Sequence, residues 1–400
     1  MRVGGFRVTL YWVIMSTLVA KPRGISRVIV TPVTSRGEQK QFVNLPWKLY
    51  EGDPNWVPPL LMDHRAQLGF RRHPFYDDAE IQTFLAVRNG QVCGRIAAIV
   101  NHAHNRRAND KRGFFGYFEA IDDQEVADGL FDAARAWLLE RGMTGMRGPT
   151  NPSLNYEVGL LIQGFHSPPT FMMTYNKPYY ARQFEAWGLK KIEDLFAFWG
   201  HIDMVSKLDK KLWFIGNEAK QRFNVTVRPM RTKNFRAEVE MFLRVYNASL
   251  IGTWGFVPLS AGEIKVLGSG LKHLIQPELA LVAEVNGEPI GACLGLLDFN
   301  PRIKKINGRL FPFGFLHLLR NPREIKKMRV ISINVVPEYQ RWGLGVVLLG
   351  GLIEPMQKWG IQEVEFSWVL ESNTLSRGSL EKGGAKLDKT YRLYDYDMTP

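Results

Sequence analysis

The stretch of this 400-residue chain best suited to a chemical task runs from Ile331 to Gly345, ISINVVPEYQRWGLG. An apolar strand ends in Val-Val-Pro, a short turn follows, and a helix is expected to begin among glycines. A helix N-terminus presents unbonded backbone N–H groups and the positive end of the helix dipole. Glycine lets an anion approach that backbone without a Cβ in the way. The spacing Gln340-x-x-Gly343-x-Gly345 therefore predicts a cradle for a pyrophosphate.

Two other phosphate-binding patterns are excluded for this stretch. A dinucleotide-binding fingerprint places its glycines directly after the strand and a carboxylate further on. A Walker A loop needs Gly-Lys followed by Ser or Thr. Residues 331–345 match neither pattern.

An internal repeat with an offset near 197 residues indicates the order of strands and helices around the cradle. Val30-Thr-Pro32 recurs as Val227-Arg-Pro229, and Asn89-Gly90 recurs as Asn286-Gly287. Each half reads as a strand, a helical stretch and two strands joined by the Asn-Gly turn, a strong hairpin signal. Each half then continues strand, helix, strand, helix, strand. This alternation predicts an α/β sandwich with a mixed sheet.

The second half resembles the GCN5-related N-acetyltransferase (GNAT) superfamily. The motif of that superfamily is a strand, Val-x-Pro and then Arg/Gln-x-x-Gly-x-Gly/Ala, which matches the strand end and residues 340–345. Asn373 stands where many members keep an asparagine, and Glu381 to Gly384 (EKGG) resembles the usual end of the next helix. The resemblance covers about residues 225–397, and it reaches residues 28–198 only through the repeat.

The resemblance implies an α/β fold of two tandem acyl-CoA N-acyltransferase (GNAT-like) domains, each a mixed twisted sheet flanked by helices. We expect a degenerate domain over 27–202, a linking helix over 203–224 and a domain with the acyl-CoA site over 225–400. The first domain is expected to be degenerate because its corresponding turn, Asp122 to Val126, has no glycine and carries three carboxylates that would repel a pyrophosphate. Residues 1–26 are expected to be an extension, either disordered or added by a start assigned too early.

The resemblance also implies where acyl-CoA binds. The pantetheine arm would pair with the strand end before the cradle, and backbone N–H groups would hold the pyrophosphate. The residues predicted to bind the co-substrate are Asn334, Val335, Val336, Gln340, Arg341, Trp342, Gly343, Leu344, Gly345 and Asn373. Acetyl-CoA is the expected donor, another acyl-CoA is the alternative, and no metal is expected.

For catalysis, the resemblance implies direct attack of an acceptor amine on the thioester, which needs a base for the amine and an acid for the departing thiolate. Many members carry a tyrosine acid just before Glu-Lys-x-Gly, but this chain has Leu380 there. We expect Tyr391 or Tyr394 to replace it, unless CoA leaves unaided or the activity is altered. Glu371 is the candidate base, and a solvated strand-end carboxylate is the alternative interpretation.

Two insertions break the repeat. Gly148 to Tyr180 is longer than a loop without function usually is, so it is expected to line an acceptor pocket, with tight packing as the alternative. Its candidate residues are Asn155, Tyr156, Glu157, Tyr175 and Asn176. Pro301 to Arg329 carries nine Lys or Arg against one Glu around the core LFPFGFLHLL. This pattern predicts contact with a membrane surface or an anion, with a solvated basic element as the alternative.

Composition narrows the partners and the compartment. A formal net charge of +13 indicates an anionic partner such as a phosphorylated co-substrate, a membrane surface or nucleic acid. Two cysteines, Cys93 and Cys293, are too few for a disulfide scaffold, so a reducing compartment and hence the cytoplasm is expected. The apolar stretch Phe6 to Ala20 is too short to span a bilayer, and a signal peptide or a true start at Met15 are the alternatives.

The leading hypothesis is transfer of an acyl group from acyl-CoA to the amine of a small molecule or peptide. Some tandem relatives instead take aminoacyl groups from aminoacyl-tRNA. The intact pyrophosphate motif disfavours that alternative and a nucleic-acid partner with it. A third hypothesis, a non-catalytic acyl-CoA-binding protein, is kept open by Leu380.

Overall fold

The computed structural model describes residues 27–207 and 210–398, and every structural statement below concerns these residues. The expectations for residues 1–26, namely an extension, a signal peptide or a start at Met15, lie outside this range. Strands and helices alternate through both halves of the described chain, which confirms the predicted α/β class.

The first half and the insertion within it supply the elements up to the linking helix. Its strands are β1 (Ile29–Pro32), β2 (Ala79–Arg88), β3 (Gln91–Asn101), β4 (Arg112–Ala120), β5 (Gly145–Gly148), β6 (Thr150–Asn151), β7 (Glu157–Val158), β8 (Leu160–Gln163) and β9 (Lys190–His201). Its helices are α1 (Arg36–Leu49), α2 (Leu61–Gln67), α3 (His102–Ala108), α4 (Gln124–Glu140) and α5 (Tyr180–Trp187). Helix α6 (Lys210–Arg222) then leads into the second half.

The second half repeats this order. Its strands are β10 (Thr226–Pro229), β11 (Ile275–Val285), β12 (Glu288–Leu297), β13 (Lys327–Val335), β14 (Glu363–Leu370) and β15 (Lys386–Asp397). Its helices are α7 (Phe235–Ser249), α8 (Ala261–Leu271), α9 (Asn300–Lys305), α10 (Phe315–Leu318), α11 (Leu344–Trp359) and α12 (Thr374–Lys382). Helices α9 and α10 belong to the second insertion.

Both predicted hairpins form at their Asn-Gly turns. Asn89 and Gly90 have φ of +53° and +75°, and Asn286 and Gly287 have φ of +54° and +82°. Two successive left-handed residues make a turn whose twist matches that of the flanking strands. The turns join β2 to β3 and β11 to β12 as antiparallel pairs.

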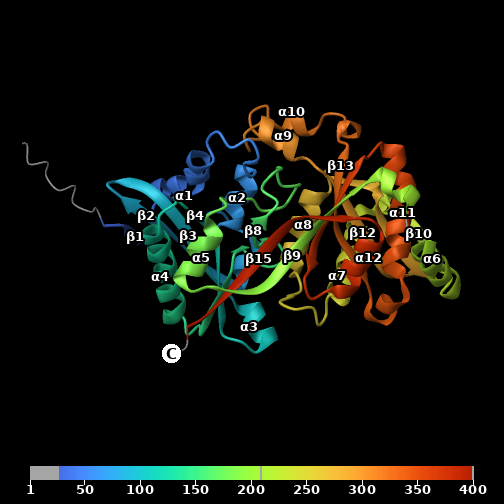
Figure 1. Ribbon diagram of the computed structural model, residues 1–400, viewed down its shortest axis with the longest axis horizontal. Coiled ribbons are helices and arrows are strands. Elements are labelled where there is room, and N and C mark those ends of the chain that lie inside the picture. Colours follow the sequence, from blue (N-terminus) through green and yellow to red (C-terminus); the bar gives the residue numbers. More distant parts are fainter. Residues whose placement is uncertain (1–26, 208–209, 399–400) are drawn as a thin grey trace, which may run out of the picture.

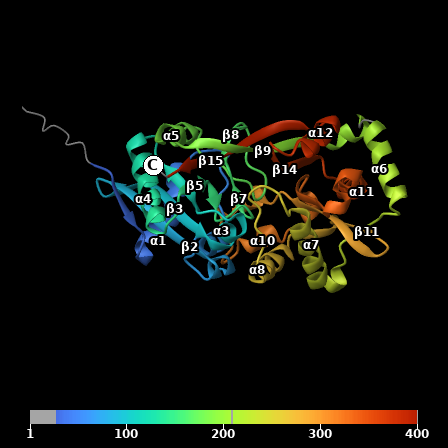
Figure 2. The ribbon, with the colours of Figure 1, turned by 90° about the horizontal axis from the view of Figure 1, so that it is seen from below.

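One continuous sheet runs through both halves. The strand order is β1-β2-β3-β4-β5-β15-β9-β14-β13-β12-β11-β10, and β8 also pairs with β15. Figure 1 shows β9 and β15 side by side across the middle of the molecule, between the blue-green first half and the orange-red second half. In Figure 2, α5 and α12 lie above the strands, and α7 and α8 lie below them.

The two halves exchange their last strands. β9 follows α5 of the first half but pairs with β14 of the second, and β15 follows α12 but pairs with β5 of the first. β9 and β15 also pair with each other. The division into domains over 27–202 and 225–400 stays a prediction, and the exchange means that neither stretch completes its own sheet.

A charged pair ties the exchanged strands together. The guanidinium of Arg392 on β15 donates from Nε and Nη2 to the two carboxylate oxygens of Asp194 on β9, at 2.8 and 3.1 Å. The Asp194 side chain is largely buried, and its only other charged partner among the described residues is Lys191, at 2.9 Å. Replacing Arg392 with alanine is expected to lower the free energy of unfolding by about 1–3 kcal/mol, because a buried carboxylate loses a two-bond partner. Urea denaturation measures this change.

An exposed pair provides the control for that experiment. Arg236 contacts Glu240 at 2.9 Å on the surface of α7, where both side chains are solvated. Arg236→Ala should therefore change the unfolding free energy by no more than about 0.5 kcal/mol. Equal effects of the two substitutions would show that the Arg392–Asp194 pair does not hold the strands.

Candidate functional site

Helix α11 begins at a glycine, without a capping side chain. Its N-cap is Gly343, at φ +80°, and no described side chain caps the helix. The N–H groups of Leu344 and Gly345 precede the first bonds of the helix, which Val346 and Val347 donate to the Gly343 carbonyl, so these two groups lack intrahelical partners. A Cβ on Gly343 would lie 2.6 Å from Cγ2 of Ile215 on α6, whereas a Cβ on Gly345 would meet only Cγ2 of Ile333, at 3.8 Å. The predicted cradle is thus a glycine turn that Ile215 covers at Gly343 and that has room for a side chain at Gly345.

The residues around the cradle hold it or carry charge beside it. Gln340 donates from Nε2 to the carbonyls of Val335 and Ser249, at 3.0 and 2.8 Å, which fixes the turn to the end of β13. The Arg222 guanidinium lies 4.2 Å from the ring centre of Trp342, so a cation stands near the cradle. Of the other predicted co-substrate residues, Arg341 is exposed and Leu344 is buried in the first turn of α11.

Two predicted asparagines differ in how much of their side chain is free. Asn373 caps α12, accepting from the N–H of Ser376 at 3.0 Å. Asn334 accepts from the hydroxyl of Ser249 at 3.1 Å, but its buried Nδ2 has no partner among the described residues. Asn334 therefore keeps an unused donor at the end of β13.

The corresponding place in the first half is filled. Asp123 caps α4 through the N–H of Glu125, and Arg88 contacts both carboxylates, at 2.6 and 2.7 Å. An anion would meet two carboxylates there. Beside β4, a Cβ on Gly116 would come within 1.8 Å of the Thr150 carbonyl oxygen, so the chain itself fills the gap next to that strand.

In the second half the equivalent strands part and leave a chamber. β13 and β14 pair in parallel only from Lys327–Glu363 to Val330–Phe366, although both strands continue beyond. A cavity of about 350 Å³ opens beside them, bounded by α6, α11, α12, the end of β9 and the 3₁₀ turn after it. Its lining is mostly apolar or glycine and includes Val330, Val347, Gly350, Gly351, Leu352, Met356, Phe366 and Leu380. Leu380 thus places an apolar side chain in the wall.

The opposite face of these strands holds a buried polar cluster that joins them to the first insertion. The guanidinium of Arg329, only 1% exposed, donates to Ser367 Oγ at 2.8 Å and to the Phe171 and Met172 carbonyls at 3.1 and 2.8 Å. Glu365 accepts from the hydroxyls of Ser367 and Thr170. We did not expect this cluster from the sequence, although charged residues inside the apolar strands RVISI and VEFSW were a signal for it.

Most of the predicted acceptor residues fasten the first insertion in place. Asn155 donates to the Val257 carbonyl at 2.8 Å, and Tyr156 donates to Glu263 at 2.9 Å. Asn176 bonds both backbone groups of Leu161. These contacts use the polar groups that an acceptor would need.

Tyr175 and Glu157 differ from those three residues. The Tyr175 hydroxyl lies 3.3 Å from both carboxylate oxygens of Asp53, in the first half. Glu157 keeps some exposure, but the protein around it raises the pKa of its carboxyl to about 7 by desolvation, against the opposing charge of Arg329. A carboxyl of that pKa can take up a proton near neutral pH.

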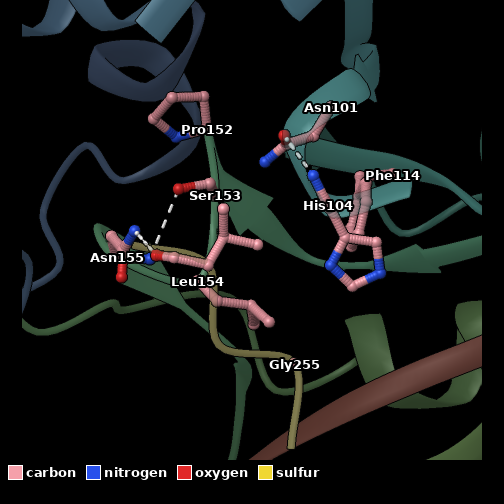
Figure 3. A pocket seen from close by; sticks show the side chains of 9 residues that line it. Asn101, His104, Phe114, Pro152, Ser153, Leu154, Asn155 and Gly255 are labelled. Carbon is pink, nitrogen blue, oxygen red and sulfur yellow. Dashed lines mark hydrogen bonds between the residues drawn. The ribbon is translucent and has the colours of Figure 1, made fainter. Parts of the chain in front are cut away.

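Figure 3 shows a small pocket beside Asn155, between the first insertion and the loop at Gly255. Its volume of about 10 Å³ has room for roughly one water molecule. His104 lines it with an unpartnered, buried Nε2, and burial lowers the pKa of that imidazole to about 4. The pocket is too small for an acceptor, and its histidine is neutral.

The structure does not gather the three predicted catalytic residues. Glu371 contacts Lys191 at 2.7 Å at the surface. Tyr391 is fully buried in the cluster with Leu195, and its hydroxyl has no partner among the described residues. Tyr394 packs in the first-half core and donates to Glu185 at 2.9 Å, away from the chamber.

Residues 27–207 and 210–398 contain no helix long and apolar enough to cross a membrane. Nor do they bring together three or more His, Cys, Asp or Glu side chains able to hold a metal ion.

Comparison with known proteins gives one family match and several relatives. Residues 257–384 match the family described as "Acetyltransferase (GNAT) family". The chain is 35% identical to Protein YghO of Escherichia coli (strain K12), covering 96% of this chain and 98% of that protein. It is 33% identical to the Bacterial ceramide synthase of Caulobacter vibrioides, covering 92% and 96% of the two chains.

Among solved structures, a tandem GNAT protein from the clavulanic acid biosynthesis pathway superposes with a TM-score of 0.53. The match covers 94% of this chain and 99% of that one, at 13% sequence identity. At that identity the likeness concerns the fold, and it agrees with the predicted tandem arrangement.

The cradle is tested by Gly345→Asp. A carboxylate in the first turn of a helix stabilises the helix by about 0.3–1 kcal/mol, and a Cβ at this position has room, so the variant should fold. The carboxylate should repel a pyrophosphate from the bare N–H groups. In thermal unfolding, acyl-CoA at about 100 times its dissociation constant should stabilise the wild type by roughly 2.7 kcal/mol, and the variant should show no such shift.

Gly270→Asp is the matched control, because it adds the same charge on α8, where a Cβ meets nothing within 4 Å. It should keep the full shift with acyl-CoA. A full shift in Gly345→Asp would mean that the start of α11 does not bind the pyrophosphate.

Proposed function

Because the chain belongs to the GCN5-related N-acetyltransferase (GNAT) family and is an N-acyltransferase of that type, we propose that it moves an acyl group from acyl-CoA to the amine of an acceptor. The observation that carries the proposal is the continuity of two features of the second half. The uncapped N-terminus of α11 follows β13 after a short 3₁₀ turn, and the apolar chamber is lined by Val346 and Val347 of the first turn of α11 and by Val330 and Phe366, where the pairing of β13 with β14 ends.

The donor is proposed to bind along these features. The first N–H groups of α11 hold the pyrophosphate, with Arg341 and Trp342 at the rim. The pantetheine arm pairs with Asn334, Val335 and Val336, where β13 has left its partner strand. The free Nδ2 of Asn334 is one donor for the arm or the thioester oxygen.

We propose that the donor is an acyl-CoA with a long acyl chain, which occupies the chamber. An engineered cavity of about 150 Å³ already holds benzene, and the chamber here measures about 350 Å³ with mostly apolar walls. The relative named a ceramide synthase supports the same direction, since a ceramide is a long-chain amino alcohol acylated on nitrogen. The sequence-based prediction of acetyl-CoA stays the alternative, and the aminoacyl-tRNA alternative is tested by the same thermal shift with tRNA.

The acceptor is proposed to be an amine carried by a lipid, in place of a small polar amine or peptide. It would approach from the face where the first insertion covers β13 and β14. The predicted membrane contact of residues 301–329 belongs to this proposal, because a lipid acceptor is delivered from a bilayer.

Glu157 is the proposed base of the reaction. The amine nitrogen bonds to the thioester carbon, the carbon–sulfur bond breaks, and the amine proton passes to the Glu157 carboxylate. Glu371, the earlier candidate, is already paired with Lys191. Tyr391 is the proposed acid for the thiolate, because its buried hydroxyl has no partner among the described residues and lies close enough to Glu365 and Arg329 for their charges to act on it. Tyr394 lies away from the chamber and has no part in the proposal.

The chain length of the donor is tested by Gly350→Leu. A Cβ on Gly350 meets no atom of the described residues within 4 Å, and the residue lines the chamber within α11. Leucine also favours the helix over glycine by roughly 0.8–1 kcal/mol. The variant should fold and fill part of the chamber, so kcat/KM for a long-chain acyl-CoA should fall about tenfold or more. Turnover of acetyl-CoA by the same variant serves as the control, and an equal loss with both donors would contradict the assignment.

The base is tested by the pH dependence of kcat in Glu157→Gln and Glu371→Gln. A base acts when it is deprotonated, so wild-type activity should rise with pH through about 7, the pKa of Glu157. Glu157→Gln should remove this rise and lower kcat roughly 10²–10⁴-fold. Glu371→Gln should keep both. The reverse pattern would restore Glu371 as the base.

A further inference from the structure

Residues 309–320, here called the docking segment, expose an unusual density of apolar side chains. Phe311, Phe313 and Leu319 are 71%, 72% and 69% exposed, and Phe315 and Leu316 are also exposed. Among the side chains that the structure describes, no other nine-residue window exposes more than one large apolar side chain. Contiguous exposed apolar groups of this kind mark an interaction surface.

Hydrogen bonds fix the backbone of the docking segment and of the residues next to it. The buried guanidinium of Arg302 donates to the carbonyls of Leu318, Arg320 and Asn321, at 3.4, 2.8 and 2.7 Å. The N–H of Phe315 bonds the Leu310 carbonyl at 2.8 Å. These hydrogen bonds satisfy backbone groups, whereas the apolar side chains stay exposed to solvent.

Exposed cations flank the apolar side chains in the sequence. Lys305, Arg309 and Arg320 are exposed, and none of them takes part in an ion pair recorded among the described residues. The one acidic residue of the insertion, Glu324, contacts Arg302 instead, at 3.4 Å. The charge that remains on this surface is therefore positive.

Residues 298–307, which lead into the docking segment, contact the first half and its insertion. Asn307 accepts from Trp47 of α1 at 2.7 Å, and Asn300 donates to the Pro169 carbonyl at 2.7 Å. The N–H of Phe171 bonds Asp298 at 3.1 Å. Figure 1 places α9 and α10 at the upper edge of the molecule, where the two halves meet.

We propose that the docking segment binds an anionic lipid bilayer. Phe311, Phe313 and Leu319 enter the interface between headgroups and acyl chains, and Arg309 and Arg320 contact the lipid phosphates. Apolar side chains flanked by cations suit this partner. The apolar side chains gain free energy by burial in the interface, the cations by attraction to anionic headgroups, and the two together bind more strongly than either alone. The purpose of the docking, delivery of a lipid acceptor, rests on the proposed function, whereas the docking itself is a property of this surface.

The test is flotation of the full-length protein with vesicles of phosphatidylcholine, with and without phosphatidylglycerol. The wild type should float with the anionic vesicles and much less with the neutral ones. The triple variant Phe311→Ser, Phe313→Ser, Leu319→Ser should bind the anionic vesicles about tenfold more weakly or worse. Arg309→Glu with Arg320→Glu should abolish the preference for anionic vesicles.

A matched control removes equally exposed apolar groups elsewhere. Phe214 on α6, Ile251 in the turn after α7 and Leu375 on α12 are 64%, 63% and 63% exposed. Phe214→Ser, Ile251→Ser, Leu375→Ser should bind vesicles as the wild type does. Insertion is checked by Phe313→Trp, whose fluorescence should be quenched by brominated lipid, with Ile251→Trp as the unquenched comparison.

Two results would overturn the inference. One is equal vesicle binding by the wild type and the Phe311 triple variant. The other is a wild-type dimer in sedimentation velocity that the triple variant dissociates, because the surface would then bind a second copy of the chain. Turnover of a soluble acyl-CoA and amine without vesicles separates the two proposals. If turnover persists without docking, only the docking fails, and if docking occurs without turnover, only the proposed function fails.

Discussion

The pairing of β9 with β15 is the constraint on which the rest of the structure depends. Each strand is the last of its half, and each completes the sheet of the other half. The exchange leaves no open strand edge at the centre, so only β1 and β10 end the twelve-strand path. Because buried strand edges must pair, the halves cannot separate without unpairing this centre.

The exchange makes the chamber composite. Most of the chamber wall lies in the second half, but residues at the end of β9, the last strand of the first half, and on the linking helix α6 also line it. The first half therefore contributes structure to the site although its own cradle position is filled by Asp123 and its own strand gap by Thr150. The repeat thus gives two similar arrangements of strands and helices, and the chamber lies in the second.

The two insertions pack on the face of the sheet opposite the chamber. Arg329 ties the first insertion to the point where β13 and β14 part, and the contact between Phe171 and Asp298 ties it to the second. A buried guanidinium needs all its donors satisfied, so the carbonyls of the insertion are positioned closely over the strands. This arrangement also brings Glu157 close enough to Arg329 for the two charges to interact.

The sequence by itself determined the local elements and the glycine turn before α11. Asn-Gly turns dictate hairpins because two left-handed residues are needed there, and Gly343 and Gly345 dictate a helix start without a Cβ. These signals act within a few residues, so they can be read directly. Only the tertiary structure decided which strands pair across the middle, since alternation of side chains assigns a face but no neighbour. It also decided that Tyr394 packs away from the chamber, that Asn155 and Tyr156 serve as fastenings, and that Arg329 and Glu365 meet under the first insertion. Those outcomes depend on contacts between residues far apart in the chain, and local propensity does not encode such contacts.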